Sequence, residues 1–257
     1  MEIHSPAVKM VQLRKRFRLA HTPVSTLKGA VAHFRKRRYE DLWALKGIDL
    51  EVPRGETLAV IGRNGSGKST MLGLIGKVYL PTDGTLEVNG KVAALLELGA
   101  GFHADLTGEQ NVILNGVILG MREKEVRGYL DQIIQFAELE DFRDAPLRAY
   151  SAGMVMRLGF AVAIFTRPDI LLIDEVLAVG DETFQAKCLR EIREFQARGG
   201  TIIFVSHDME SVRSVASRVL WVSKGEIKLQ GGVNEVVKAY LAESAALASR
   251  TDTSHPH

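Results

Sequence analysis

Apolar residues follow two patterns along the chain: short unbroken runs, and stripes that repeat every three or four positions. Unbroken runs are typical of strands buried on both faces of a parallel sheet, and the stripes are typical of amphipathic helices. The clearest runs are Thr57–Ile61, Ile170–Ile173 and Thr201–Val205. The clearest stripe consists of Val126, Leu130, Ile133, Ile134 and Ala137. The pattern therefore predicts a mixed α/β chain.

Along the chain, the segments predict a β-rich start, then an α/β core, a helical insertion, and finally a return to the α/β core. Asn89-Gly90 predicts a hairpin turn between strands at Thr85–Val88 and Val92–Leu96. Three helices follow, at about 100–167; the capping-box pair Thr107 and Gln110 precedes the first. Later segments read as a helix at Glu182–Arg198, a hairpin of Val219–Val222 with Glu226–Leu229, and a last helix at Val233–Ala242. The small polar residues from Ser244 onward predict a disordered tail.

A glycine-rich stretch after the first buried run carries the clearest chemistry. It fits the pattern GxxxxGK[ST] and consists of Gly62, Arg63, Asn64, Gly65, Ser66, Gly67, Lys68, Ser69 and Thr70. Glycines let backbone amides surround a phosphate, and the following helix adds the positive end of its dipole. Lys68 can reach the β- and γ-phosphates, and the Ser69 hydroxyl can bind Mg²⁺. A nucleoside triphosphate site is therefore expected, against the simple alternative of a glycine-rich turn.

Acids and a histidine follow the other two buried runs. Asp174 can hold Mg²⁺ and Glu175 can act on the attacking water, although two acids can also cap a helix. His207 is placed to contact the γ-phosphate, although a histidine at a strand end is more often structural. Ser151 and Gly153 sit at a third helix start, which is a second anion site. A second site makes sense if two chains face each other and each completes the other's nucleotide site.

Composition and charge limit the kinds of protein and of binding partner that fit this sequence. The chain has 257 residues, one cysteine, a hydrophobic fraction of 46% and a net charge of +2. The single cysteine suits a reducing cytoplasm, no secretory signal is visible, and no apolar run can span a bilayer. Residues 1–40 hold ten basic and two acidic residues, a charge of +8, so the remainder sums to −6. This basic head indicates an anionic partner or simply a solvated charged face.

Together these motifs resemble the ATP-binding subunit of an ABC transporter. The resemblance covers about residues 8–240 and rests on the following segments: Gly62–Thr70, Tyr150–Met154, Ile170–Glu175, Gly180-Asp181 and His207. Other stretches resemble the subgroup that exports bacterial O-antigen or teichoic acid, namely Trp43–Lys46, Leu95–Phe102, Met154 and Asp174–Asp181. The implied fold is a RecA-like P-loop NTPase core with an N-terminal antiparallel β subdomain and an inserted α-helical subdomain. The implied cassette covers residues 1–243, with a polar tail at 244–257.

The sequence departs from the family pattern at several positions. The family usually has Gln where the core meets the helical subdomain; Glu97 is the expected occupant here and would be an Mg²⁺ or water ligand. Met154 replaces the last residue of the usual LSGGQ signature and loses a polar contact. The aromatic residue that stacks on adenine is either Phe17 or Tyr39, and Tyr39 is favoured because it lies at the usual distance before Ala44. Some O-antigen exporters add a β-sandwich at the C-terminus; the polar tail at 244–257 leads us to expect none here.

The resemblance implies an ATPase that works with Mg²⁺ as a head-to-tail homodimer. Its implied partners are two copies of a polytopic membrane permease, through which a lipid-linked glycan moves, and no nucleic acid is expected. The implied location is peripheral, at the cytoplasmic face of the inner membrane. Segment 22–38 reads as an inserted basic amphipathic helix, with a stripe at Val24, Leu27, Val31 and Phe34. It is either a gate for anionic lipid headgroups or a helix packed on its own domain.

Two other functions stay open at this point. A soluble ATP-gated clamp could act on DNA or ribosomes through the basic head, but such proteins usually carry two cassettes or long coiled coils. The second alternative is an ABC transporter ATPase for another substrate, such as a drug or a lipid.

Overall fold

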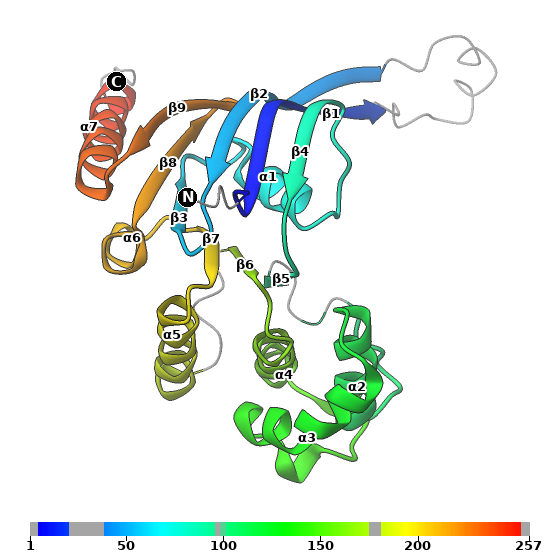
Figure 1. Ribbon diagram of the computed structural model, residues 1–257. Helices are drawn as coiled ribbons and strands as arrows, with labels where there is room; N and C mark the ends of the chain where they lie inside the picture. Colours follow the sequence, from blue (N-terminus) through cyan, green and yellow to red (C-terminus); the bar gives the residue numbers. More distant parts are fainter. Residues whose placement is uncertain (1–4, 21–38, 96–98, 100, 175–180, 253–257) are drawn as a thin grey trace, which may run out of the picture.

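Two sheets and a group of helices form three layers (Figure 1). The computed structural model describes residues 5–20, 39–95, 99, 101–174 and 181–252. The first sheet has the order β2-β1-β4, and the second has the order β5-β6-β7-β3-β8-β9. The expected α/β fold with an N-terminal antiparallel sheet and an inserted helical subdomain is confirmed.

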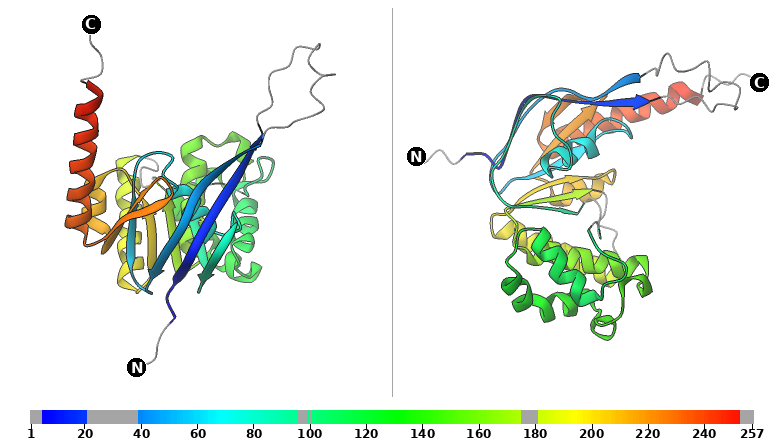
Figure 2. Two further views of the ribbon diagram at one scale, coloured as in Figure 1. Left: turned by 90° about the horizontal axis from the view of Figure 1, so that it is seen from above. Right: turned by 90° about the vertical axis from the view of Figure 1, so that its right-hand side faces the viewer.

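The N-terminal sheet is antiparallel and ends in a long two-stranded ribbon. Its strands are β1 (Val8–Ala20), β2 (Tyr39–Val52) and β4 (Asp83–Val88). Figure 2 shows this ribbon and α7 (Val233–Asp252) projecting from the same side of the body. Segment 22–38 lies outside the described residues, so its expected helix is not tested.

The central sheet carries the predicted buried strands. These are β5 (Val92–Leu95), β6 (Ile170–Asp174), β7 (Thr201–Val205), β3 (Thr57–Ile61), β8 (Arg218–Ser223) and the antiparallel edge strand β9 (Glu226–Gly231). Successive residues of β6 alternate between two cores: Ile170 and Leu172 face one core, and Leu171 and Ile173 face the other. The aliphatic run is therefore buried on both faces, as expected of a central parallel strand.

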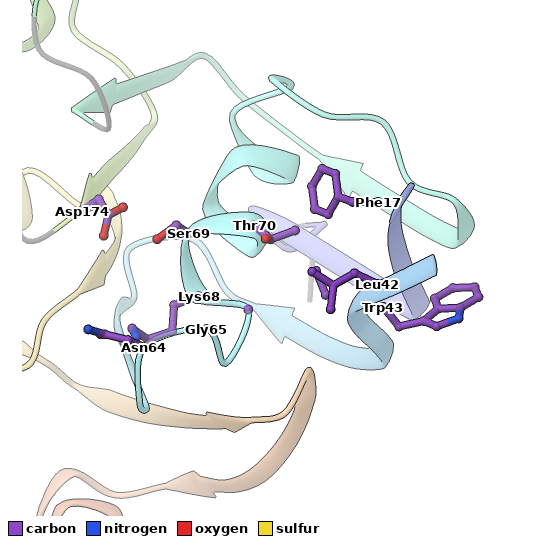
Figure 3. Close-up of a pocket in the computed structure, with 11 residues that line it drawn as sticks. Phe17, Leu42, Trp43, Asn64, Gly65, Lys68, Ser69, Thr70 and Asp174 are labelled. Atoms are coloured by element: carbon purple, nitrogen blue, oxygen red, sulfur yellow. The ribbon is translucent and has the colours of Figure 1, made fainter. Parts of the chain in front are cut away.

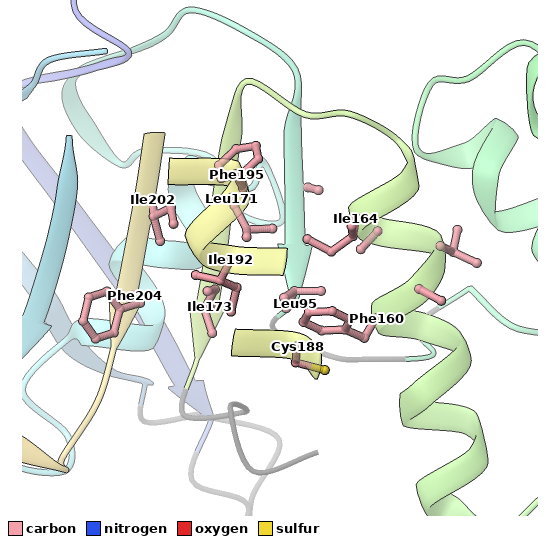
Figure 4. Close-up of a cluster of buried hydrophobic side chains, with 14 of the residues drawn as sticks. Leu95, Phe160, Ile164, Leu171, Ile173, Cys188, Ile192, Phe195, Ile202 and Phe204 are labelled. Atoms are coloured by element: carbon pink, nitrogen blue, oxygen red, sulfur yellow. The ribbon is translucent and has the colours of Figure 1, made fainter. Parts of the chain in front are cut away.

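Helices cover the sheet and build the inserted subdomain. They are α1 (Lys68–Ile75), α2 (Gly108–Ile118), α3 (Glu123–Ala137), α4 (Ala152–Phe165), α5 (Glu182–Ala197) and α6 (Met209–Val215), besides α7. Two short 3₁₀ turns, Glu140–Phe142 and Leu147–Ala149, connect α3 to α4. Figure 4 shows side chains of α4 and α5 packed against the central strands, with Phe160 beside Leu95 and Cys188. No helix among the described residues is long and apolar enough to cross a bilayer.

The structure corrects two of the predicted elements. Asn89-Gly90 does not form a hairpin, because β4 and β5 belong to different sheets. The turn is instead a crossover, in which the Asn89 amide groups bond to Ala7 and Pro6 and Gly90 passes close to Asp169. The tail predicted as disordered from Ser244 is also wrong as far as Asp252, because α7 continues to that residue. The extension is rich in alanine, which has the highest helix propensity.

Candidate functional site

The phosphate loop (Gly62–Thr70) connects β3 to α1 and depends on glycines at two close approaches. A Cβ at Gly62 would lie 2.2 Å from the carbonyl oxygen of Val222, and a Cβ at Gly67 would lie 2.6 Å from that of Ala44. Gly67 is also the N-cap of α1, with a φ of 110°. The loop therefore folds tightly against its neighbours, and backbone amides rather than side chains form its surface at the helix start.

Lys68 lies in the centre of this loop and is nearly buried. Its exposed fraction is 7%, and its Nζ donates hydrogen bonds to the carbonyl oxygens of Gly62 at 2.9 Å and Arg63 at 3.2 Å. A buried cation beside the first turn of a helix makes the loop an anion site, because both contribute positive potential at one place.

A further backbone contact links the loop to two other elements. The amide of Gly225, in the β8–β9 turn, donates to the carbonyl oxygen of Ser66 at 2.9 Å, and the carbonyl of Gly225 accepts from Lys46 of β2 at 2.9 Å. Gly225 has a φ of 83°, and a Cβ there would meet the carbonyl oxygen of Ala44 at 2.8 Å. The sequence analysis missed this support, although Lys224-Gly225 is a typical turn sequence.

The carboxyl ends of three parallel strands bring Asp174 and the segment that contains His207 to the sheet edge where the phosphate loop starts. Val205 of β7 pairs with Asp174 of β6 on one side and with Val60 of β3 on the other. Asp174, His207 and the start of the phosphate loop therefore meet at the same edge of the sheet, where ligands of open α/β sheets bind. Asp174 lines the same cavity as Lys68. Glu175 directly follows β6 in the chain and Glu97 is the second residue after β5, but both lie outside the described residues.

His207 comes just before a short helix that the sequence analysis did not include. Asp208 caps α6 by accepting hydrogen bonds from the amides of Glu210 and Ser211, both at 3.1 Å. A hydrogen bond from the Ser211 hydroxyl, supported by these two backbone bonds, lowers the pKa of Asp208. The signal was present, because an Asp before a short apolar-polar segment is a helix-start pattern. The cap fixes the chain directly after His207, whose side chain is exposed.

A cavity of about 590 Å³ opens between the phosphate loop and the N-terminal sheet. Figure 3 shows Asp174 on one side of it and Phe17 on the other, with Ser69 and Thr70 of α1 between them. The lining residues of the sheet are Phe17, Leu42, Trp43 and Ala44, and those of the loop and β6 are Asn64, Gly65, Gly67, Lys68, Ser69, Thr70 and Asp174. One end of the cavity is thus polar and cationic, and the other is apolar and aromatic.

The structure places Phe17 at this aromatic end, directly opposite Leu42 in the β1–β2 pairing. Tyr39, which the sequence analysis favoured, starts β2 and pairs with Ala20, three positions farther along the ribbon. Three residues of a strand span about 10 Å. The side chain of Tyr39 is not described, so the Tyr39 hypothesis stays a prediction. Leu42 and Trp43 are lining residues that sequence reasoning missed.

The second predicted anion site lies at the start of α4. The Ser151 hydroxyl caps the helix by accepting a hydrogen bond from the Met154 amide at 3.2 Å. In return, the Ser151 amide donates to the Met154 sulfur at 3.4 Å. Met154 therefore keeps the reciprocal cap that a Gln would make, so the expected loss of a polar contact is only partial.

Gly153 lies beside this cap. Apart from its chain neighbours and its own helix backbone, a Cβ on Gly153 would have one neighbour within 4 Å among the described residues, the Ser151 hydroxyl at 3.8 Å. Among the described residues that line the phosphate cavity, none comes from Tyr150–Met154. Packing within one chain thus gives no reason for a glycine here, and this signature does not reach the phosphate loop of its own chain.

An ionic cluster connects α4 to the end of α3 and the start of α5. Arg157 of α4 bonds to Glu138 at 2.9 Å and to Asp181 at 2.6 Å, and its guanidinium lies 4.8 Å from the ring centre of Phe184. Asp181 also caps α5 by accepting from the Phe184 amide at 2.9 Å. That backbone bond is the main cause that lowers the pKa of Asp181, and Arg157 adds to it. The start of the signature helix is thereby fixed relative to α5.

Comparison with known proteins agrees with this geometry. The family model described as ABC transporter matches residues 45–178. An O-antigen export system ATP-binding protein of Klebsiella pneumoniae is 44% identical over 239 residues, which are 91% of this chain and 97% of that protein. A teichoic acids export ATP-binding protein of Enterococcus faecalis is 41% identical over 235 residues, which are 91% of this chain and 52% of that longer protein.

Solved structures share the fold. A dimeric ATP-binding cassette, MJ0796, in a post-hydrolysis state bound to ADP and Pi, superposes with a TM-score of 0.71 at 23% identity. The match covers 88% of this chain and 98% of that one. The phosphate loop, the strand-end acid and the family match agree: the chain belongs to the ABC transporter family and is an ATP-binding, ATP-hydrolysing cassette.

Proposed function

We propose that this cassette powers the export of a lipid-linked polysaccharide of the O-antigen or teichoic acid type. The observation that carries the proposal is the 44% identity to an O-antigen export protein over nearly the whole length of both chains. A similar identity to a teichoic acids export protein supports the broader class of lipid-linked glycans.

Two copies of the chain work head to tail in this proposal. Ser151 and Gly153 of one copy bind the γ-phosphate held by the phosphate loop of the other. Support comes from the exposed α4 start, which does not line its own cavity, and from the space around Gly153. Closing the dimer on two ATP molecules and reopening it after hydrolysis supplies the mechanical step.

The donor set around the phosphate loop fits a magnesium ion. Ser69 and Asp174 line one cavity, and hydroxyl and carboxylate oxygens are suitable ligands for this hard cation. Bound Mg²⁺ would neutralise charge on the β- and γ-phosphates. Glu97, the second residue after β5 in the chain, is proposed as a further oxygen ligand. Glu175 is the proposed base that removes a proton from the attacking water, and His207 the proposed donor to the γ-phosphate.

The adenine is proposed to bind at the aromatic end of the cavity, against Phe17. The Phe17 ring lines the same cavity as the phosphate loop, and the residue paired with Phe17 on β2 is the apolar Leu42. Stacking on an aromatic face stabilises a bound base by about 1–3 kcal/mol in nucleic-acid complexes, so one ring can contribute substantially.

The membrane permease is proposed to bind the helical subdomain. Leu114, Val117 and Ile118 of α2 have exposed fractions of 37%, 44% and 61%. Their spacing of three and four places them on one face of the helix. An exposed apolar face of this kind is typical of a protein-binding surface. The cassette would then be peripheral, at the cytoplasmic face of the inner membrane beneath two permease copies.

The proposal is tested by complementation in the source cell. Deleting the gene should abolish surface polysaccharide and leave lipid-linked glycan inside the cell; the wild-type gene should restore export. The Glu175→Gln variant, expressed at the same level, should not restore it. Normal surface polysaccharide in the deletion strain would contradict the proposed substrate while leaving the ATPase assignment intact.

A further inference from the structure

The Phe17 ring is held from two sides at the end of the cavity away from Asp174 (Figure 3). Tyr79 meets it edge-on, with ring centres 5.4 Å apart and planes at 83°, a favoured geometry for aromatic pairs. The Lys15 ammonium lies 5.1 Å from the ring centre of Phe17 and 5.5 Å from that of Tyr79, within the range of cation–π attraction. The ring of Phe17 is therefore fixed by neighbours rather than free on an open strand.

Both neighbours are themselves fixed to the body of the protein. Lys15 Nζ donates a hydrogen bond of 2.8 Å to the carbonyl oxygen of Leu80. The Tyr79 ring lies against the backbone of α1, since a Cβ at Gly73 would meet two of its carbons at 2.8 Å. The Tyr79 amide donates to the Gly73 carbonyl oxygen at 3.2 Å. Tyr79 thus forms a bridge from the phosphate-binding helix to the ring in the N-terminal sheet.

We propose that Tyr79 and Lys15 are positioning residues that hold the Phe17 ring at the distance from the phosphate loop that an adenine nucleotide requires. The proposal rests on the proposed function in one respect, the contact between Phe17 and adenine. A ring held in place loses little conformational freedom when the base binds, so preorganisation increases affinity for the nucleotide. The same bridge does nothing for a ligand that has phosphates and no base. Tyr79 and Lys15 therefore set the preference for a nucleotide over an inorganic polyphosphate.

The test compares two ligands on matched variants. Dissociation constants for ATP and for inorganic tripolyphosphate are measured by calorimetry on wild type, Tyr79→Ala, Tyr79→Phe and Lys15→Met. Tyr79→Ala and Lys15→Met should each weaken ATP binding about two- to tenfold, the size expected for one aromatic or cation–π contact. Binding of tripolyphosphate should not change. Tyr79→Phe should bind ATP like wild type, because it keeps the ring edge.

A matched control lies in the helical subdomain. The Tyr129 ring centre lies 6.0 Å from that of Phe165 and 5.2 Å from the Arg167 guanidinium, so Tyr129 has the same kind of partners as Tyr79. It belongs to α3 and does not line the cavity. Tyr129→Ala should leave both dissociation constants unchanged. Equal weakening of ATP and tripolyphosphate binding in Tyr79→Ala would overturn the proposal, because it would mean that Tyr79 supports the phosphate loop itself.

Failure of the inference can be told apart from failure of the proposed function. If Phe17→Ala weakens ATP binding and neither Tyr79→Ala nor Lys15→Met does, the adenine contact stands and the positioning role is overturned. If Phe17→Ala binds ATP like wild type, the adenine contact lies elsewhere and the inference also fails. The export assay tests the polysaccharide substrate and is independent of either result.

Discussion

Glycines of the phosphate loop and of the signature have unequal roles. The distances from an added Cβ to its neighbours show which glycine the fold requires. Gly62 has a φ of 149°, and its missing Cβ makes room for the carbonyl oxygen of Val222 and the Ser66 hydroxyl. Gly153 of the signature has no such crowding from the part of its own chain that the structure describes. The first glycine therefore serves the fold of the loop, and the second is available for a ligand or a second chain.

Gly62→Ala should destabilise the chain by about 1–3 kcal/mol, the usual cost of a strained backbone position, and should abolish ATP binding. Thermal unfolding and calorimetry measure the two effects. Gly153→Ala is the matched control and should unfold at the wild-type temperature or slightly higher, because alanine favours helices. A normal ATP affinity in Gly62→Ala would mean that the loop tolerates a Cβ after all.

Cys188 of α5 should be chemically inert in the folded protein. It is 2% exposed, and burial raises its pKa to about 12. The reactive form is the thiolate, and at pH 8.5 the folded state keeps the thiol protonated, whereas an unfolded cysteine is about half ionised. Iodoacetamide at this pH should modify the denatured chain quickly and the native chain at least tenfold more slowly. Equal rates would mean that α5 opens or that the thiol is accessible.

Local sequence patterns pick out single positions that lie together in the structure, but they do not identify positions that depend on tertiary contacts. The phosphate loop and Asp174 follow from local patterns, and the structure brings both to one cavity. Leu42 and Trp43 could not be assigned, because their place in the cavity depends on how two sheets are stacked. Gly225 acts through a hydrogen bond to Ser66, which is more than 150 positions away, so no local pattern predicts it.

Helices and strands could be predicted where a regular pattern of apolar residues marks the buried positions of the element. All five apolar positions of the predicted α3 stripe are buried, and the Thr107–Gln110 capping box is present. The Asn89-Gly90 hairpin failed because a turn signal does not tell which sheet the next strand joins. The predicted last helix ends before α7 does, because small and polar residues also fit a tail, whereas the alanines among them favour helix.

The cluster of Arg157 with Glu138 and Asp181 should stabilise the contact between α4, α3 and α5. Arg157→Ala should lower the free energy of unfolding by about 1–2 kcal/mol, the sum expected for partly exposed ion pairs and one cation–π contact. Asp181→Asn keeps the cap of α5, so a double-mutant cycle with Arg157→Ala isolates the ion pair. Arg127→Ala, which breaks an exposed pair with Glu123, should cost less than about 0.5 kcal/mol. Additive effects of Arg157→Ala and Asp181→Asn would exclude coupling.

In the proposed head-to-tail dimer, each chain contributes one half of each of two nucleotide sites. Its phosphate loop lines a cavity with Asp174, while its exposed signature at Ser151 lines no part of that cavity. In two copies arranged head to tail, the phosphate loop of each copy would face the signature of the other, which would form two complete sites. The proposed coupling of ATP to transport depends on this arrangement, because only a dimer that closes on ATP can transmit a movement to a permease.

Mixing two inactive variants should recover activity if the sites are shared. Lys68→Ala removes the loop lysine, and Gly153→Asp places a carboxylate where the partner's γ-phosphate would bind. In a mixed dimer, one shared site carries both changes and the other carries neither. ATPase activity of the mixture should exceed that of either variant alone, up to about one quarter of wild type, because half of the dimers are mixed and each has one intact site. A purely additive result would argue against shared sites.

The most direct test measures the molar mass of the Glu175→Gln variant by light scattering with and without ATP. Losing the general base should slow hydrolysis by roughly 10²–10⁴-fold while ATP still binds, so the closed dimer should accumulate. We expect the monomer mass of 28.3 kDa without ATP and twice that mass with ATP. Adding Gly153→Asp to this variant should return the mass to that of the monomer. One mass in all three samples, or a dimer that persists with Gly153→Asp, would contradict the head-to-tail arrangement.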